Sequence, residues 1–245
     1  MNKIFVSACK LTLRSFSLAF KKYSFSGNSL SSLLFLSCAQ PFVVFFFYLK
    51  IKPNIITYIR FFFGLIIIYF AFNYQIQLSI ICFIFFKILD YTDGSIARLS
   101  NNKTFYGKFI DSSSDLFIEV FFLLFLGFYF FNLLNDYNFL KLYMGSIIFW
   151  IFGQFIYDKY GSLTRWSNFE NKKNAIPNIK EIKLQRVILI LDDIYFFSFF
   201  LMIYNLQFFA PKAAFMLIFS CILFGFINVI IHLMSASRNL RENKK

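Results

Sequence analysis

The sequence predicts an all-α, polytopic integral membrane protein: a six-helix transmembrane bundle preceded by N-terminal amphipathic and interfacial helices. The first indication is composition, because 59% of the 245 residues are hydrophobic and only 15% are charged. The second is the arrangement of apolar residues in runs long enough to cross a bilayer core of about 30 Å. The third is the charge pattern, because most lysines and arginines fall between alternate apolar runs.

Residues 1–52 form the predicted N-terminal segment, which is basic and amphipathic. It is not a cleavable signal peptide, because Lys10 and Arg14 interrupt any apolar core. On a helix, the four cations Lys3, Lys10, Arg14 and Lys21 all fall within about 20° of one line parallel to the helix axis. Apolar side chains occupy the far side, so this helix suits the surface of an anionic leaflet. The alternative is a poorly ordered basic tail.

Residues 23–49 carry no charge, but several serines, Gln40 and Pro41 make this run less apolar. We therefore expect residues 41–50 to form an interfacial helix, with a true membrane span as the alternative. Six stronger candidate spans follow, at about residues 53–72, 76–98, 105–132, 140–158, 186–205 and 211–234. They define a predicted membrane domain at 53–234, which is followed by a basic tail at 235–245.

The distribution of cations predicts the orientation in the membrane. An even number of spans places both termini on one side. That side carries seven Lys and Arg residues in the N-terminal segment, three at 98–108, seven at 159–186 and four in the tail. The opposite side carries only Lys141 and Lys212. The positive-inside rule therefore predicts that both termini and the acidic site described next face the cytoplasm. The net charge of +13 then reflects cytoplasmic loops and anionic lipid; no nucleic-acid motif accompanies it.

Four of the twelve acidic residues lie between positions 90 and 115, with hydrophobic sequence on both sides. Asp90 and Asp93 share one face of a helix, and Asp111 and Asp115 share a face of the next. Residues 99–106 can turn the chain, so two antiparallel helices would bring the four carboxylates together. Carboxylates within membrane segments usually mark a functional site. The alternative, a polar packing seam, would rarely need four acids without matching cations.

The predicted cluster offers only carboxylate oxygens, with no His or Cys ligand. Four carboxylates at close range need protons or cations to neutralise them. Oxygen-only ligands favour a hard ion such as Mg²⁺ or Mn²⁺. Two ions would balance four negative charges, and paired ions suit phosphoryl transfer.

The residues from Asp90 to Asp115 resemble the signature of the CDP-alcohol phosphotransferase (CDP-alcohol phosphatidyltransferase) family. They match Asp-x2-Asp-Gly-x2-Ala-Arg-x8-Gly-x3-Asp-x3-Asp at every fixed position. The stretch Pro53-Asn54-x-x-Thr57 also looks like the start of the family's first membrane helix. Arg60 would share a face with Thr57, and an arginine at membrane depth needs a partner: the acidic cluster or a bound phosphate. The resemblance covers about residues 38–234, although only 52–60 and 90–115 match closely.

The resemblance implies a transferase of phospholipid biosynthesis. Members of the family move a phosphatidyl-type group from a CDP-linked lipid, such as CDP-diacylglycerol, to an alcohol and release CMP. The resemblance implies that Asp90, Asp93 and Asp111 are ligands of two Mg²⁺ or Mn²⁺ ions. Asp115 would be the remaining ligand and the general base. The implied donor-binding residues are Asn54, Thr57, Gly94, Ala97, Arg98 and Gly107. A homodimer is also implied.

The acceptor, a small alcohol or an alcohol phosphate, is not indicated by the residues themselves. In family members that use phosphorylated alcohols, basic residues around the predicted loop at 159–186 hold the acceptor phosphate. Arg186 and Arg165 are therefore the candidate acceptor-binding residues. An ordinary positive-inside anchor is the alternative for Arg186. Glu119 would either bind a cationic headgroup or pair with Lys87 or another buried group, and we favour the pairing. His232 is expected to be a packing or interface residue and not a ligand.

Two other functions compete with the transferase. A divalent-cation transporter also buries acidic residues within membrane helices. However, the sequence has no second, symmetry-related acidic segment of the kind that inverted-repeat transporters show. A catalytically silent scaffold would not need an intact signature. No role is predicted for Asp192 and Asp193.

Overall fold

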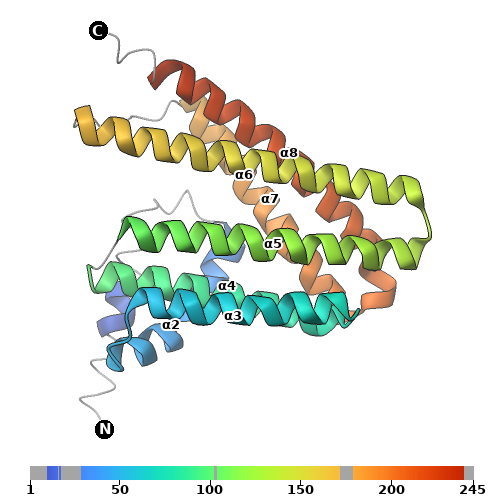
Figure 1. Cartoon of the computed structure of the whole chain (residues 1–245), viewed down its shortest axis with the longest axis horizontal. Coiled ribbons are helices and arrows are strands. Elements are labelled where there is room, and N and C mark those ends of the chain that lie inside the picture. The colour runs from blue at the N-terminus through green and yellow to red at the C-terminus, as the bar shows by residue number, and fades with distance from the viewer. Residues whose placement is uncertain (1–9, 16, 18–28, 102–103, 172–178, 240–245) are drawn as a thin grey trace. The chain divides into compact units, whose positions relative to one another are not determined.

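The computed structural model describes residues 10–15, 17, 29–101, 104–171 and 179–239. These residues are almost entirely helical and include no strand, which confirms the all-α prediction. The helices are α2 (Leu30–Tyr48), α3 (Pro53–Phe72), α4 (Ile76–Leu99), α5 (Phe105–Leu134), α6 (Tyr137–Asn171), α7 (Ile179–Tyr204) and α8 (Leu206–Asn239), as Figure 1 shows. The chain divides into two compact units, residues 1–129 and 130–245.

Six described helices are long and apolar enough to cross a membrane, which confirms the predicted number. The set differs from the prediction in one member. It includes α2, and it does not include α4, which covers the predicted span at 76–98. The 24 residues of α4 are sufficient in length, but Lys87, Asp90, Asp93 and Arg98 lower its hydropathy. The helix that carries half of the acidic cluster is therefore the one helix from α2 to α8 that lies outside the apolar set.

Helix α2 corrects the expectation that an interfacial helix begins at Pro41. It is one continuous helix of 19 residues that begins at Leu30, with Pro41 in its interior. Ser29 caps its start, because the Ser32 N–H donates to Ser29 Oγ at 3.1 Å. A proline removes one backbone donor from a helix, yet here the helix continues past it.

Of the predicted amphipathic helix at residues 1–22, the structure describes residues 10–15 and 17; the rest, with Lys3 and Lys21, lies outside the described residues. Residues 10–15 are helical. Leu11 packs against a buried apolar cluster made by Val43, Ile56, Ile96 and Leu99. This cluster joins α2, α3 and α4, so at least one residue of the N-terminal segment contributes to the first unit.

Aromatic contacts and interhelical hydrogen bonds hold α3, α4 and α5 side by side in the first unit (Figure 1). The Phe83 ring on α4 stacks on Phe122 of α5, with ring centroids 4.6 Å apart. Ser79 Oγ donates to the Ile67 carbonyl oxygen at 2.9 Å and joins α4 to α3. Without a hydrophobic effect in lipid, such close packing and hydrogen bonding are the forces that associate membrane helices.

The second unit contains α6, α7, α8 and the end of α5. Gly153 on α6 and Gly225 on α8 face each other so closely that a Cβ on Gly153 would lie 2.6 Å from the Gly225 Cα. Small residues of this kind let two membrane helices approach. His232 is buried, and its ring lies 5.3 Å from the Tyr157 ring and 5.2 Å from the Tyr160 ring. These contacts agree with the packing role expected for His232.

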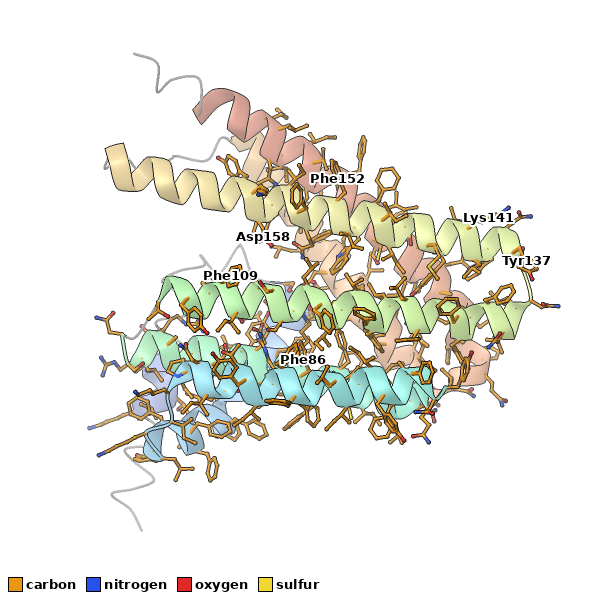
Figure 2. All side chains as sticks on the ribbon, viewed as in Figure 1. Phe86, Phe109, Tyr137, Lys141, Phe152 and Asp158 are labelled. Carbon is orange, nitrogen blue, oxygen red and sulfur yellow. The ribbon has the colours of Figure 1, made fainter. Side chains whose placement is uncertain are left out.

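Helix α6 is longer than the sequence suggested. The predicted span ended at residue 158 and a loop was expected at 159–186, but α6 extends to Asn171 and α7 begins at Ile179. Polar residues beyond the apolar run continue the helix, because helical propensity does not end where hydrophobicity ends. Figure 2 shows Tyr137 and Lys141 at the start of this helix, well separated from Asp158.

Candidate functional site

The start of α3 places three polar side chains on one face of the first unit. Pro53 occupies the first helical position, where its missing N–H costs nothing and its fixed φ suits the helix. Asn54, Thr57 and Arg60 follow at intervals of three residues, so they lie along one side of the helix. Thr57 and Arg60 are buried and Asn54 is half-buried. The predicted sharing of a face by Thr57 and Arg60 thus brings both residues into the interior.

The turn between α4 and α5 makes the two helices antiparallel, as predicted. Asn101 adopts a left-handed conformation with a φ of 52° after the end of α4. Thr104 then caps α5, because the Gly107 N–H donates to Thr104 Oγ1 at 2.9 Å. The chain therefore reverses within a few residues, and the acidic faces of α4 and α5 can meet.

The four signature aspartates converge between these helices. One carboxylate oxygen from each of Asp90, Asp93 and Asp111 lies within 4.8 Å of the others. Asp115 lies on the same face of α5 as Asp111 and shares a partner with all three. Asp93 is buried, and the other three carboxylates are partly buried. The predicted acidic cluster is therefore present within the first unit.

The shared partner is Arg60, whose guanidinium lies among the four carboxylates. Its Nη1 pairs with Asp90 and lies 3.7 Å from Asp93 Oδ2. Its Nη2 lies 2.8 Å from Asp111 Oδ1 and 2.7 Å from Asp115 Oδ1. The Arg60 side chain has no exposed surface. Of the two partners expected for Arg60, the structure provides the acidic cluster.

Three further side chains complete the cluster. Thr57 Oγ1 donates to Asp93 Oδ2 at 2.9 Å. Ser114 Oγ lies 3.3 Å from Arg60 Nη2 and accepts from it. Lys108 Nζ donates to Asp111 Oδ2 at 2.9 Å. Sequence reasoning did not assign Ser114 or Lys108 to the site, although each lies three residues from Asp111 and therefore shares its helix face.

The charge balance of the cluster fits a divalent cation. Arg60 and Lys108 compensate two of the four carboxylates, and Lys87 pairs with Glu119 instead. Two negative charges remain on groups that are at least partly buried, and either protons or a further cation must neutralise them. Asp115 Oδ1 is buried and accepts no hydrogen bond, even though Arg60 Nη2 is near. An oxygen-only set with residual negative charge suits Mg²⁺ or Mn²⁺.

The residues expected to bind the donor fall into two groups. Asn54 and Gly107 lie side by side, because a Cβ on Gly107 would lie 2.8 Å from Asn54 Oδ1. The lack of a side chain at Gly107 thus lets α3 approach the start of α5 closely. Gly94 lies beside Arg98, whose Nη2 donates to Ser95 Oγ on the same helix at 2.9 Å. Ala97 is half-buried between them on α4.

A pocket of about 410 Å³ opens where the turn from α2 to α3 meets the end of α4. Its lining combines apolar side chains with two lysines: Phe47, Tyr48, Lys50, Ile51, Lys52, Pro53, Ile96 and Ser100. It adjoins the stretch that begins at Asn54 and was not anticipated from the sequence. Its chemistry suits a ligand with an apolar part and an anionic end.

The candidate acceptor residues belong to the second unit. Arg186 is exposed on α7. Arg165 lies in α6, and its side chain is outside the part of the chain whose side chains are described. An acceptor role for Arg186 and Arg165 therefore stays a prediction. The predicted pairing of Glu119 with Lys87 is confirmed by an ion pair between the two side chains.

Comparison with known proteins gives one result. A family model described as CDP-alcohol phosphatidyltransferase matches residues 50–236. The match covers most of the chain and contains α3, the acidic signature and the whole membrane part of the second unit. No curated protein matches the chain.

Proposed function

Because the chain belongs to the CDP-alcohol phosphatidyltransferase family, we propose that it transfers a phosphatidyl-type group from a CDP-linked lipid to an alcohol. Family membership and the apolar helices make it a membrane transferase of phospholipid biosynthesis. The observation that carries the finer proposal is the convergence of the four signature aspartates around one buried arginine. A packing seam alone would need protons on two of the four carboxylates, whereas one divalent ion balances both charges.

We expect the four aspartates to hold two Mg²⁺ or Mn²⁺ ions. When bound, such ions polarise a diphosphate and neutralise the charge that develops on a leaving nucleotide. Asp90 and Asp93 on α4, with Asp111 on α5, supply the oxygen ligands. Thr57 supports this arrangement, because its hydroxyl fixes the orientation of the Asp93 carboxylate.

Asp115 is the group we expect to accept the proton. The acceptor hydroxyl oxygen forms a bond to the phosphorus of the donor, and the bond from that phosphorus to CMP breaks. CMP leaves with the electron pair, while the hydroxyl proton passes to the Asp115 carboxylate. Asp115 Oδ1 is ion-paired with Arg60 Nη2 at 2.7 Å, and a carboxylate oxygen with one such partner still has a lone pair for this proton. A positioned base of this kind typically contributes on the order of 10² to 10⁴ in rate.

The remaining assignments concern the donor, the membrane and the assembly. The proposed donor-binding residues are Asn54, Thr57, Gly94, Ala97, Arg98 and Gly107, and Gly107 keeps the approach between α3 and α5 open. The charge count supports an active site and termini on the cytoplasmic face. We retain the division into residues 1–52, 53–234 and 235–245, and a homodimer, as proposals.

Release of CMP from CDP-diacylglycerol by the purified protein in mixed micelles tests this function. The assay compares glycerol 3-phosphate, serine, inositol, inositol phosphate and choline as acceptors, each with Mg²⁺ or Mn²⁺. We expect release with one acceptor class and its loss when a chelator removes the ions. Full activity in chelator would contradict the two-metal proposal. Absence of release with every acceptor, together with Mn²⁺ uptake into protein-containing vesicles, would favour the transporter instead.

A further inference from the structure

The guanidinium of Arg60 occupies the space in which the proposed function places metal ions. Its Nη1 faces the α4 pair, Asp90 and Asp93, and its Nη2 faces the α5 pair, Asp111 and Asp115. It therefore bridges the two acidic helices from a third helix. An arginine stays charged in a protein, so it cannot give way by losing a proton. A divalent ion can therefore enter the cluster only beside the positive charge of Arg60 or after the guanidinium has moved away.

Charge counting limits what the cluster holds while Arg60 remains in place. With Arg60 and Lys108 present, the four carboxylates keep two negative charges, which balance one divalent ion. A second ion would leave the cluster with excess positive charge. Lys108 can move away at little cost, because its side chain is 59% exposed, whereas that of Arg60 is 0% exposed. Arg60 is therefore the cation that decides whether a second ion can bind.

The surroundings of Arg60 hold it in place but leave one donor unused. Its Cζ lies 5.1 Å from the centroid of the Phe86 ring, and Nη2 donates to Ser114 Oγ at 3.3 Å. Its Nε is buried and makes no hydrogen bond. A buried donor without a partner is rare and indicates an acceptor that binds there. A diphosphate supplies such acceptors, since a guanidinium binds phosphate oxygens as well as carboxylates.

We propose that Arg60 is a resident counter-cation that competes with divalent ions for the aspartate cluster. In the free protein it holds the four carboxylates together and limits the cluster to one ion. When the diphosphate of a CDP-linked ligand binds, Arg60 shifts from the carboxylates to the diphosphate, and the second ion enters. This inference rests on the proposed function for the identity of the cluster as a metal centre. It makes loading of the second ion depend on the donor.

Binding of Mn²⁺ to the full-length purified protein, followed by electron paramagnetic resonance with and without CDP, tests this inference. We expect the parent protein to bind one Mn²⁺ without CDP and two with it. Arg60→Met removes the cation but keeps an apolar chain of similar reach. It should bind two Mn²⁺ without CDP, with the first bound about tenfold more tightly or better, because a nearby like charge is gone. Arg60→Lys keeps the positive charge and should still bind one Mn²⁺ without CDP.

Lys108→Met is the matched control, because it removes the other cation of the cluster. Its effect on Mn²⁺ affinity should be smaller, since the exposed Lys108 charge is screened by water and salt. Unchanged Mn²⁺ number and affinity in Arg60→Met would overturn the inference. If that variant does not fold, two tightly bound Mn²⁺ in the CDP-free parent protein would overturn it equally.

The outcomes separate this inference from the proposed function. If a second Mn²⁺ binds only with CDP but no CMP is released from CDP-diacylglycerol, the role of Arg60 is supported and the transferase function is contradicted. If CMP release depends on metal but Arg60→Met does not change ion binding, the transferase function is supported and the role of Arg60 is contradicted. No binding of Mn²⁺ by any of the forms would contradict both.

Discussion

Lys87 on α4 and Glu119 on α5 form an ion pair one helical turn from the acidic cluster. The side chains are only 12% and 10% exposed. Lys87 lies three residues before Asp90, and Glu119 lies four residues after Asp115, so the pair continues the same two helix faces. Because Lys87 and Glu119 neutralise each other, the pair adds no net charge to the aspartate cluster.

Removal of either partner of this pair should destabilise the protein. Lys87→Met leaves a buried carboxylate unpaired, and Glu119→Leu leaves a buried ammonium unpaired; each should lower the free energy of unfolding by about 3–5 kcal/mol. The double variant should recover most of that loss, since two apolar side chains replace a desolvated pair. Denaturation of each variant by increasing sodium dodecyl sulfate measures the change. A double variant as unstable as the single ones would show that the pair acts through other contacts.

The bond from Thr57 to Asp93 should affect metal affinity. Thr57→Val keeps the shape of the side chain but removes the donor to Asp93 Oδ2. Loss of a hydrogen bond to a metal ligand typically costs 10- to 100-fold in affinity, so we expect about that loss for Mn²⁺. Thr57→Ser retains the hydroxyl and should bind Mn²⁺ nearly as well as the parent protein. Equal affinity in the valine and serine variants would show that this bond does not orient Asp93.

A side chain at position 107 should disturb donor binding. In Gly107→Ala the new Cβ would lie 2.8 Å from Asn54 Oδ1 and 2.9 Å from Thr104 Oγ1, so Asn54 or the helix cap must move. We expect weaker binding of CDP-diacylglycerol, measured by titration of the purified protein. Gly145→Ala is the matched control, because it also lies within a helix and a Cβ there meets nothing within 4 Å. Donor affinity that is unchanged in Gly107→Ala would contradict a tight approach at this point.

Replacement of individual aspartates should separate ligands from the base. Asp93→Asn should lose both metal-dependent donor binding and turnover, because it removes an ion ligand. Asp115→Asn should keep much of the binding but lose on the order of 10² to 10⁴ in rate. The measurement is CDP-diacylglycerol affinity across a Mg²⁺ titration, together with CMP release. If Asp115→Asn binds the donor as poorly as Asp93→Asn, Asp115 is primarily a ligand. Near-parent turnover would exclude it as the base.

The predicted orientation can be tested at two matched asparagines. Asn101 and Asn135 are exposed turn residues with φ values of 52° and 49°, and they lie beyond opposite ends of α5. After replacement of the native cysteines, Asn135→Cys should react with a membrane-impermeant thiol reagent outside intact cells. Asn101→Cys should react only after the cells are opened, because the cation count places that turn in the cytoplasm. Labelling of Asn101→Cys from outside would reverse the orientation.

The sequence was sufficient to predict the acidic cluster because the relevant rules are local. Residues three or four positions apart share a helix face, and one short turn suffices to bring Asp90 and Asp111 together. Composition predicted five of the six membrane helices for the same reason, since length and hydropathy are properties of a segment. The errors are the exchange of α4 for α2 in that set and several helix boundaries. Pro41 does not begin α2, and α6 continues to Asn171, because neither a proline nor a change in polarity necessarily ends a helix.

Only the tertiary structure decided how the cluster is neutralised. Sequence alone left Arg60 with two possible partners, and it missed Lys108 and Ser114. Arg60 precedes Asp90 by 30 residues and Asp111 by 51, so no local periodicity relates them. Their contact depends on how α3 packs against α4 and α5, which follows from Ser79, Phe83 and other buried side chains together. Charge compensation in this site is therefore a property of three packed helices, whereas the aspartate spacing belongs to the sequence.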